Sequence, residues 1–309
     1  MTHYLHNINP IVFEIGGPFA VRWYGISYLL GFVASILLLR RWSRRGEFEV
    51  PEREVSNFIV LLAIFGVFLG GRIGYLLLYG LGTVLEDPLY AFRVWDGGMS
   101  SHGGFIGAIL LMIWYAKKHK HSLWNITDNM AATTSLGFAF GRLANFVNGE
   151  LWGRATNMKW AVLFPQEAGY HYGQYDLPLI EQLVEAGRIV PRHPSQLYQA
   201  FAEGFLVFGV MLALRKTAWG KRPGALSASY LVLYALARVA MEFFREPDNG
   251  AFFIGFITKG QFYSLLMILG ALLIAWRKRL FSREIVSVSY THLTLPTRCH
   301  RCGGRGAGG

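Results

Sequence analysis

Three arginines lie within or at the edges of long apolar stretches: Arg72, Arg142 and Arg238. An arginine at mid-bilayer costs at least about 2.5 kcal/mol, so a chain keeps one there when it faces a partner, a water-filled cavity or an anionic ligand. Snorkelling to the membrane interface is an alternative, which the apolar runs on both sides of Arg72 make difficult. For Arg72, a structural ion pair and a ligand-binding role both stay open.

Two polar stripes around Arg142 and Arg238 predict a site for an anion. In "GRLANFVNGELWG", residues 141–153, Asn145 shares the helical face of Arg142, and Glu150 follows where the helix should end. Arg238 shares its stripe with three polar residues at helical spacing: Tyr234, Glu242 and Arg245. Glu242 could merely neutralise an arginine. The arginines nevertheless outnumber the acids on the two stripes, and this surplus predicts an anion with several acceptors, such as phosphate.

A histidine and a tyrosine precede apolar stretches at the same side of the predicted membrane. His102 lies between glycines in "WDGGMSSHGGFIG", where a backbone or a lipid headgroup can come close. Histidine titrates near neutral pH, which suits a general base or a hydrogen-bond donor. Tyr24, in "RWYG", is also what an aromatic belt at a membrane interface would place there. A histidine without a catalytic role is the simpler alternative for His102.

Motifs for covalent or metal-dependent catalysis are absent from the sequence. There is no G-x-S-x-G, H-E-x-x-H or P-loop pattern, so no metal and no cofactor is expected. The cysteines, Cys299 and Cys302, lie in a C-terminal stretch unlike the rest, and a lone C-x-x-C is a poor zinc signal. We interpret residues 285–309 as a non-native or disordered tail, which leaves no cysteine nucleophile in the chain.

The composition places these residues in a membrane protein. The chain is 53% hydrophobic and 16% charged, with a mean hydropathy of +0.31, whereas soluble domains carry about 25% charged residues. Apolar blocks of nearly membrane-spanning length recur along the chain. They are roughly Trp23–Leu39, Asn57–Tyr79, Gly103–Ala116, Ile126–Phe146, Gln196–Leu214, Ala225–Phe244 and Gln261–Trp276. We therefore predict an all-α polytopic membrane protein of about seven transmembrane helices, the third and fourth blocks being the weakest.

Basic residues set the predicted orientation. Of 30 Lys and Arg residues, 16 follow the first, third, fifth and seventh blocks. This positive-inside pattern predicts a cytoplasmic C-terminus and an N-terminus outside, with the first block retained as a span. The net charge of +11 is therefore interpreted as a topology signal with some attraction to anionic membrane lipids, and not as a sign of nucleic-acid binding.

One long loop and several spaced glycines complete the predicted organisation. Residues 148–195 are long enough for a small extracytoplasmic subdomain, with a short helix near Pro178–Ala186. Residues 148–195 are thus predicted to be an insertion in an integral membrane domain that covers residues 1–284. Glycines four residues apart, such as Gly70 and Gly74, favour close packing of membrane helices.

Several segments resemble bacterial prolipoprotein diacylglyceryl transferases. Besides "GRLANFVNGELWG", the resemblance includes "GVFLGGRIGY", "DPLYAFRVWDGGMSSHGG", "RHPSQLY" and "RVAMEFFREPD", in the expected order over about residues 10–280. "RWYG" has Arg22 where histidine is common in the family, and the C-terminal tail matches nothing in it.

The resemblance implies a reaction in the bacterial cytoplasmic (inner) membrane. The diacylglyceryl group of phosphatidylglycerol would move to the lipobox cysteine thiol in the signal peptide of a prolipoprotein, and glycerol phosphate would leave. By the same resemblance Arg142 and Arg238 would hold the lipid phosphate, and His102 would assist thiol deprotonation or orient the headgroup. The remaining matched residues would shape the pocket or support Arg238: Tyr24, Asn145, Glu150, Gly153, Glu242 and Arg245. A non-enzymatic lipid carrier or channel, or another headgroup transferase, are the alternatives.

Overall fold

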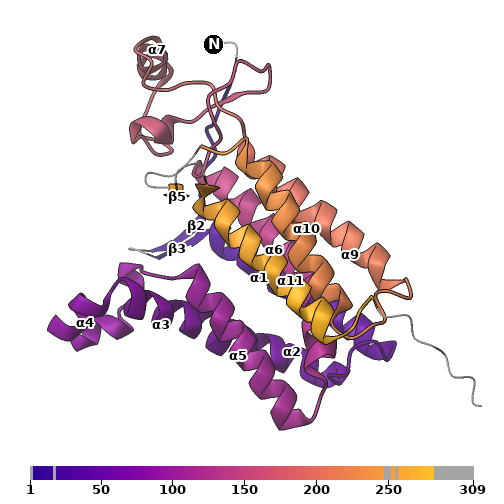
Figure 1. Ribbon diagram of the computed structural model, residues 1–309. Coiled ribbons are helices and arrows are strands. Elements are labelled where there is room, and N and C mark those ends of the chain that lie inside the picture. The colour runs from indigo at the N-terminus through magenta and orange to yellow at the C-terminus, as the bar shows by residue number, and fades with distance from the viewer. Residues whose placement is uncertain (1–2, 17–18, 247–251, 255–256, 282–309) are drawn as a thin grey trace, which may run out of the picture.

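The computed structural model describes residues 3–16, 19–246, 252–254 and 257–281 as a helical bundle (Figure 1). Each of the predicted apolar blocks is helical. The helices are α1 (Trp23–Arg44), α2 (Glu52–Leu61) continued by η1 (Leu62–Phe68) and α3 (Leu69–Leu78), α5 (Ser101–His119), α6 (Leu123–Asn148), α8 (Ser195–Gln199) continued by η5 (Ala200–Leu206) and α9 (Val207–Arg215), α10 (Ala225–Glu242) and α11 (Lys259–Arg277). Both η1 and η5 are π-helical.

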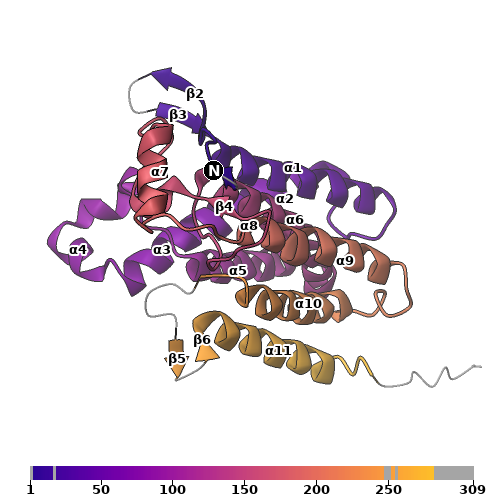
Figure 2. The same ribbon diagram turned by 90° about the horizontal axis from the view of Figure 1, so that it is seen from above.

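Five of these helical stretches in the described chain are long and apolar enough to cross a bilayer: Trp23–Arg44, Glu52–Leu78, Ser195–Arg215, Ala225–Glu242 and Gly260–Arg277. The prediction of a mostly helical, multi-pass membrane protein is thereby confirmed, while the count of seven spans stays a prediction. Helix α6 is more polar because it is the central helix, in contact with α1, α5, η5, α9 and α10 (Figure 2). A helix surrounded by protein presents little surface to lipid, so it can carry Asp128 and Arg142.

Asp128 has a structural role inside the bundle. Its carboxylate accepts hydrogen bonds from the backbone N–H groups of Gly224 (2.7 Å) and Ser227 (2.7 Å) and from the Ser227 hydroxyl (2.6 Å). These groups lie at the N-terminus of α10, where backbone donors lack partners within the helix. Asp128 therefore attaches the start of α10 to α6.

Glycines join α3 to α5. A Cβ atom added at Gly74 would lie 2.5 Å from the Gly103 Cα, and one at Gly70 would lie 2.7 Å from the Gly103 carbonyl oxygen. The two backbones therefore touch, as the spacing of these glycines predicts. This contact fixes the start of α5, where His102 lies.

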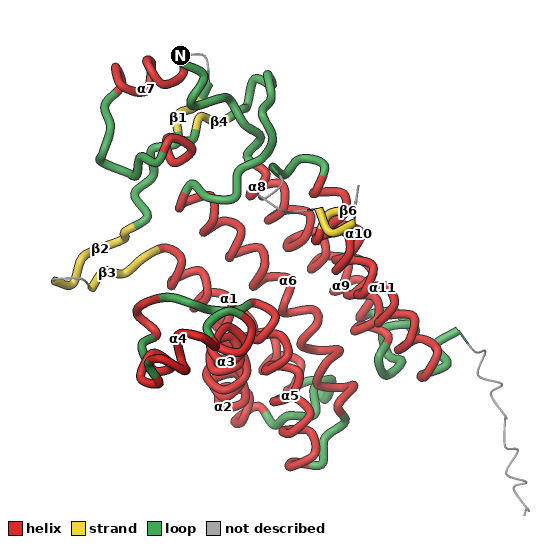
Figure 3. Tube along the Cα trace, turned by 60° about the vertical axis from the view of Figure 1, so that its left-hand side comes forward, coloured by secondary structure: helices red, strands yellow, loops and turns green. Residues whose placement is uncertain are grey.

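Short elements cover one end of the bundle (Figure 3). One of them is a hairpin of β2 (Ile11–Gly16) and β3 (Phe19–Arg22). The connection from α3 to α5 contains helix α4 (Leu81–Glu86) and two 3-10 turns, η2 (Pro88–Phe92) and η3 (Val94–Asp96). Strands β5 (Phe252–Ile254) and β6 (Ile257–Thr258) precede α11. Most of the large apolar side chains of α4 to η3 are exposed, among them Leu85 and Trp95.

Residues 148–195 fold against the N-terminal segment. Strand β1 (Tyr4–Leu5) pairs in parallel with β4 (Val162–Leu163), followed by η4 (Pro165–Ala168) and α7 (Leu177–Glu185). Leu163, Ile180, Leu183 and Ile189 form a separate buried cluster, against which Leu5 packs. The helix expected near Pro178–Ala186 is thus present as α7. That this segment lies outside the cell stays a prediction.

His6 attaches the N-terminal segment to α6 in a pH-dependent way. Its ring is fully buried, with Nε2 donating to the Phe146 carbonyl (2.7 Å) and Nδ1 facing the Gln166 amide (3.3 Å). Burial lowers the pKa of His6 below its usual 6.5. The unfolded segment therefore binds the proton more readily, so the stability that neutral His6 contributes is present above pH 6.5 and is lost as the pH falls below it.

We expect hydrogen exchange at the His6 amide, which donates to the Leu163 carbonyl (2.9 Å), to accelerate more between pH 7 and pH 5 than intrinsic exchange rates explain. In His6→Gln this extra acceleration should disappear, because glutamine does not titrate in that range. An identical pH profile in the wild type and the variant would contradict the prediction.

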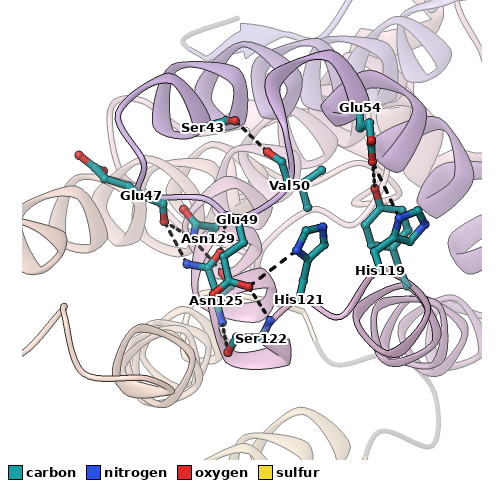
Figure 4. Close-up of polar contacts among 11 residues, drawn as sticks. Ser43, Glu47, Glu49, Val50, Glu54, His119, His121, Ser122, Asn125 and Asn129 are labelled. Carbon is teal, nitrogen blue, oxygen red and sulfur yellow. Dashed lines mark hydrogen bonds and ion pairs between the residues drawn. The ribbon is translucent and has the colours of Figure 1, made fainter.

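At the opposite end of the bundle, hydrogen bonds connect the α1–α2 turn to the α5–α6 turn and the start of α6 (Figure 4). Asn125 Nδ2 donates to the Glu47 carbonyl (3.1 Å), and the Glu49 amide donates to Asn125 Oδ1 (2.9 Å). The Ser122 amide donates to the Glu49 carboxylate (2.5 Å), and His121 lies 3.9 Å from it. These contacts hold α5 and α6 to the first helix pair.

Candidate active site

Arg142 and Arg238 meet at a shared carboxylate. Glu203 Oε2 accepts hydrogen bonds from Arg142 Nε (3.3 Å) and Nη2 (3.2 Å), and Glu203 Oε1 lies 4.0 Å from Arg238 Nη1. The Glu203 side chain is fully buried, and those of Arg142 and Arg238 are 15% and 13% exposed. The structure therefore brings together the two arginines that the sequence places on separate stripes.

Glu203 was missed because it lies on a third apolar block. The sequence did contain a signal for it, because Glu203 is a charged residue inside the apolar stretch "YQAFAEGFLV". The free-energy cost of a charge in the membrane, which singled out the arginines, applies to it as well. Its presence adds a buried carboxylate that the count on the two stripes did not include. Arg142 and Arg238 face the carboxylates of Glu203 and Glu242.

The hydrogen bonds of this charged group are nevertheless incomplete. Arg238 Nη1 lies 2.5 Å from Glu242 Oε2 and 4.0 Å from Glu203 Oε1, yet all three of these buried atoms lack a well-oriented hydrogen bond. Buried charges are usually hydrogen-bonded as well as paired. Of these three atoms only Arg238 Nη1 is a donor, so a phosphate would have to compete with the Glu203 and Glu242 carboxylates for it. Tyr234 also lies within electrostatic range of Glu203 and both arginines.

Asn145 and Glu150 are joined by the end of α6. Gly149 adopts a left-handed conformation (φ 65°), and the Glu150 amide folds back onto the Asn145 carbonyl (3.1 Å). The Asn145 side-chain amide then donates to the Glu150 carboxylate (2.7 Å). Gln196 Nε2 donates to the Glu150 carbonyl (2.7 Å) and holds the turn against α8. The two polar residues therefore form one unit at the end of the Arg142 helix.

Tyr24 lies in the first turn of α1 and is half-buried. Its ring centroid is 5.4 Å from that of Tyr28, which lies within electrostatic range of Glu150. Tyr24 and Tyr28 therefore form an aromatic pair in the first turns of α1.

Gly153 lies where three motif segments cross. Its amide donates to the His193 carbonyl (2.9 Å), and its backbone forms an antiparallel bridge with Arg245. A Cβ atom at this position would lie 2.5 Å from the Phe244 carbonyl oxygen and 2.6 Å from that of His193. Only glycine allows this approach. Gly153 therefore joins the end of α10 to the long loop, with Arg245 held at the same junction.

We expect Gly153→Ala to weaken this junction, because the added methyl group meets backbone atoms on two sides and cannot be accommodated by a rotamer change. Forced overpacking costs about 1–3 kcal/mol, so the melting temperature of detergent-solubilised protein should fall by several degrees. Gly82→Ala, in α4 with nothing within 4 Å of an added Cβ, is the control and should not lower the melting temperature. Equal melting temperatures for Gly153→Ala and the wild type would contradict the prediction.

His102 lies at the start of α5, and its ring centroid is 4.8 Å from that of Tyr263 on α11. Gly260 precedes Tyr263 by three residues, and an added Cβ there would lie 3.1 Å from Arg238 Nη2 and 3.2 Å from the Glu242 carboxylate. Residues three apart share a helix face. The first turn of α11 therefore runs from the Arg238–Glu242 pair to exposed His102.

Arg72 has a structural environment unlike that of the other two arginines. It is 3% exposed, and its guanidinium donates to the carbonyl oxygens of Tyr90 (2.5 Å), Ala91 (3.1 Å), Arg93 (3.0 Å), Gly97 and Gly98 (3.1 Å). Its partners in the described chain are carbonyl oxygens, so the role is structural but is not an ion pair. Arg72 fixes the segment that leads into His102.

No group of three or more His, Cys, Asp or Glu side chains within the described ranges could hold a metal ion. Cys299 and Cys302 lie outside those ranges, as do residues 285–309 altogether.

Comparison with known proteins assigns the chain to a family. The sequence profile of the family described as prolipoprotein diacylglyceryl transferase matches residues 10–277. The chain belongs to this family. A phosphatidylglycerol–prolipoprotein diacylglyceryl transferase of Sodalis glossinidius is 42% identical over 93% of this chain and 99% of its own length. A protein of the same name from Cronobacter sakazakii is 43% identical over 89% and 96%. In this diacylglyceryl transferase, then, Arg142, Glu203 and Arg238 all lie within the matched region.

Proposed function

We propose that this chain transfers the diacylglyceryl group of phosphatidylglycerol to the cysteine thiol of a prolipoprotein lipobox at the Arg142–Arg238 site. Membership of the diacylglyceryl transferase family supports the reaction, and the names of its relatives support the two substrates. The observation that carries the location is the meeting of two largely buried arginines around Glu203, whose carboxylate lies 4.0 Å from Arg238 Nη1.

The reaction is a displacement at carbon. The thiol sulfur attacks the CH₂ carbon of the diacylglyceryl group that bears the phosphate, and a C–S bond forms as the C–O bond breaks. The electron pair of the C–O bond leaves with the phosphate oxygen, so glycerol phosphate departs with one more unit of negative charge. The thiol proton balances that charge. The enzyme needs no nucleophile of its own, because the substrate cysteine provides it.

Arg142 and Arg238 are placed to stabilise the leaving group. Fixed donors aimed at developing negative charge act strongly in a site from which water is excluded. Their guanidinium groups come from α6 and α10, so two sides of one phosphate can be contacted at once. Glu242, four residues after Arg238 on the same helix, keeps that guanidinium directed at the site.

His102 receives the thiol proton in this proposal. A free cysteine has a pKa of about 8.5, so an acceptor close to the sulfur raises the fraction of thiolate. His102 is exposed, so a peptide thiol can reach its ring, and the first turn of α11 connects its surroundings to Arg238. Asn145 with Glu150, and Tyr24 through Tyr28, form the polar wall on the α6 and α1 side.

We place the site in the outer half of the bacterial cytoplasmic membrane. The end of α6, the end of α10 and the starts of α1 and α11 lie together beside the 148–195 segment (Figure 1). The basic clusters of the described chain follow the other ends of the helices. By the positive-inside rule this supports a periplasmic N-terminus and subdomain, and in the proposal α5 and α6 complete seven spans.

Purified protein in detergent, given phosphatidylglycerol and a lipobox peptide, tests the proposal. Release of glycerol phosphate and a matching mass increase on the peptide cysteine are expected. A peptide with Ser in place of the cysteine is the control and should remain unmodified. A folded protein that binds phosphatidylglycerol without turning it over would overturn the proposed activity in favour of lipid transport.

A further inference from the structure

Glu203 lies in an unusual backbone conformation at the centre of the site. It belongs to the π-helical stretch η5, which interrupts the helix between α8 and α9. π-helical turns inside α-helices are frequent at functional sites. The next residue, Gly204, packs so closely against α6 that an added Cβ would lie 2.7 Å from the Ala139 Cα. Ala139 lies about one turn before Arg142 on α6, so this contact holds the Glu203 backbone beside Arg142.

The Glu203 carboxylate contacts the arginines as a phosphate would. Its two oxygens face different guanidinium groups, with Oε2 on Arg142 and Oε1 toward Arg238. Two non-bridging phosphate oxygens can make the same pair of contacts. The two contacts are unequal. Arg142 is hydrogen-bonded at 3.2 Å, whereas Arg238 lies 4.0 Å away and Glu203 Oε1 has no hydrogen bond.

This inference rests on the proposed function: we propose that Glu203 is a positioning residue that holds the two arginines in place before the lipid binds and yields Arg238 to the lipid phosphate. Without a shared anion, two buried guanidinium groups on different helices would repel each other. When phosphatidylglycerol binds, its phosphate takes the loosely held side at Arg238, while Arg142 stays oriented by Oε2. The carboxylate then lies beside a second anion, and this repulsion favours departure of glycerol phosphate.

This role predicts opposite changes in substrate affinity and turnover. In Glu203→Gln the anion that competes with phosphate is lost, while a side chain of nearly the same shape remains. We expect the KM for phosphatidylglycerol to fall about fivefold to tenfold, roughly the effect of one weak ionic contact. The value of kcat should fall by at least a similar factor, because product leaves slowly and the arginines are less well oriented. Inhibition by added glycerol phosphate should become stronger in the same proportion.

A residue needed only for folding would behave differently. Its loss would lower the amount of active enzyme or raise KM, and it would leave the inhibition constant of glycerol phosphate unchanged. Unchanged or raised KM in Glu203→Gln, with unchanged inhibition, overturns the proposal. Glu181→Gln, on the exposed surface of α7, is the matched control and should retain wild-type kinetics.

Two further measurements keep the inference testable. If Glu203→Gln does not fold, Glu203→Asp keeps the charge but shortens its reach, and it should lower KM by a smaller factor. A wild-type KM in that variant overturns the proposal. If the wild type shows no turnover, the proposed function fails. Equilibrium binding of glycerol phosphate then tests Glu203 separately. If Glu203→Gln binds glycerol phosphate no more tightly than the wild type does, the proposed role of Glu203 is overturned.

Discussion

Turnover of phosphatidylglycerol should fall by about 10²–10³-fold when Arg142 or Arg238 is replaced by lysine, the loss typical of removing one donor from a charge-stabilising site. Lysine keeps the positive charge but offers a single ammonium in place of a fork. For Arg142 the change removes one of two donors to Glu203, and for Arg238 it disturbs the pair with Glu242. The measurement is release of glycerol phosphate by purified variants.

Arg192→Lys is the matched control, because Arg192 is also paired with two acids but lies in the long loop. Its guanidinium contacts Glu167 (2.5 Å) and Glu246 (3.3 Å), and the hydrogen bond to Glu167 raises the pKa of Arg192. Its replacement should lower thermal stability more than kcat. Wild-type kcat in Arg142→Lys or Arg238→Lys would contradict a direct role for that arginine in the reaction.

The sequence was most informative where a single segment determines the outcome. Long apolar blocks predicted the helices, and the paired glycines predicted the contact between α3 and α5. The end of the helix near Glu150 was also a local signal, and the structure ends α6 at Asn148, with Asn145 in contact with Glu150. These features depend on hydropathy, side-chain size and backbone conformation, which can be read within one stretch of chain.

Contacts between distant segments could not be predicted in this way. Glu203 lies on a helix that periodicity alone does not place beside Arg142, so the charge count on two stripes left this carboxylate out. The pairing of β1 with β4 involves two residues on each side, too few for a pattern. The carbonyl partners of Arg72 are backbone atoms, which every residue type has, so no pattern of side chains in the sequence predicts them.

Arg72→Met should unfold the segment from residue 88 to residue 98 and, through it, misplace His102. Five carbonyl oxygens lose their donor, and each buried group left without a partner costs about 1–3 kcal/mol unless the segment moves into water. Hydrogen exchange in this segment should therefore rise strongly. Because the Ser100 amide is bonded to the Gly71 carbonyl (2.9 Å) next to Arg72, disorder here reaches the start of α5.

We expect kcat of Arg72→Met to fall more than tenfold, a loss of at least about 1.4 kcal/mol in transition-state stabilisation. Arg93→Met is the control in the same segment, because its pairs with Asp87 (2.6 Å) and Asp96 (3.1 Å) are partly exposed and such pairs contribute only about 0–1 kcal/mol. Wild-type exchange rates over residues 88–98 in Arg72→Met would show that the segment holds its shape without the guanidinium. The burial of Arg72 would then bring no structural benefit. Arg72 would have to be considered, like Arg142 and Arg238, as a residue that contacts the substrate.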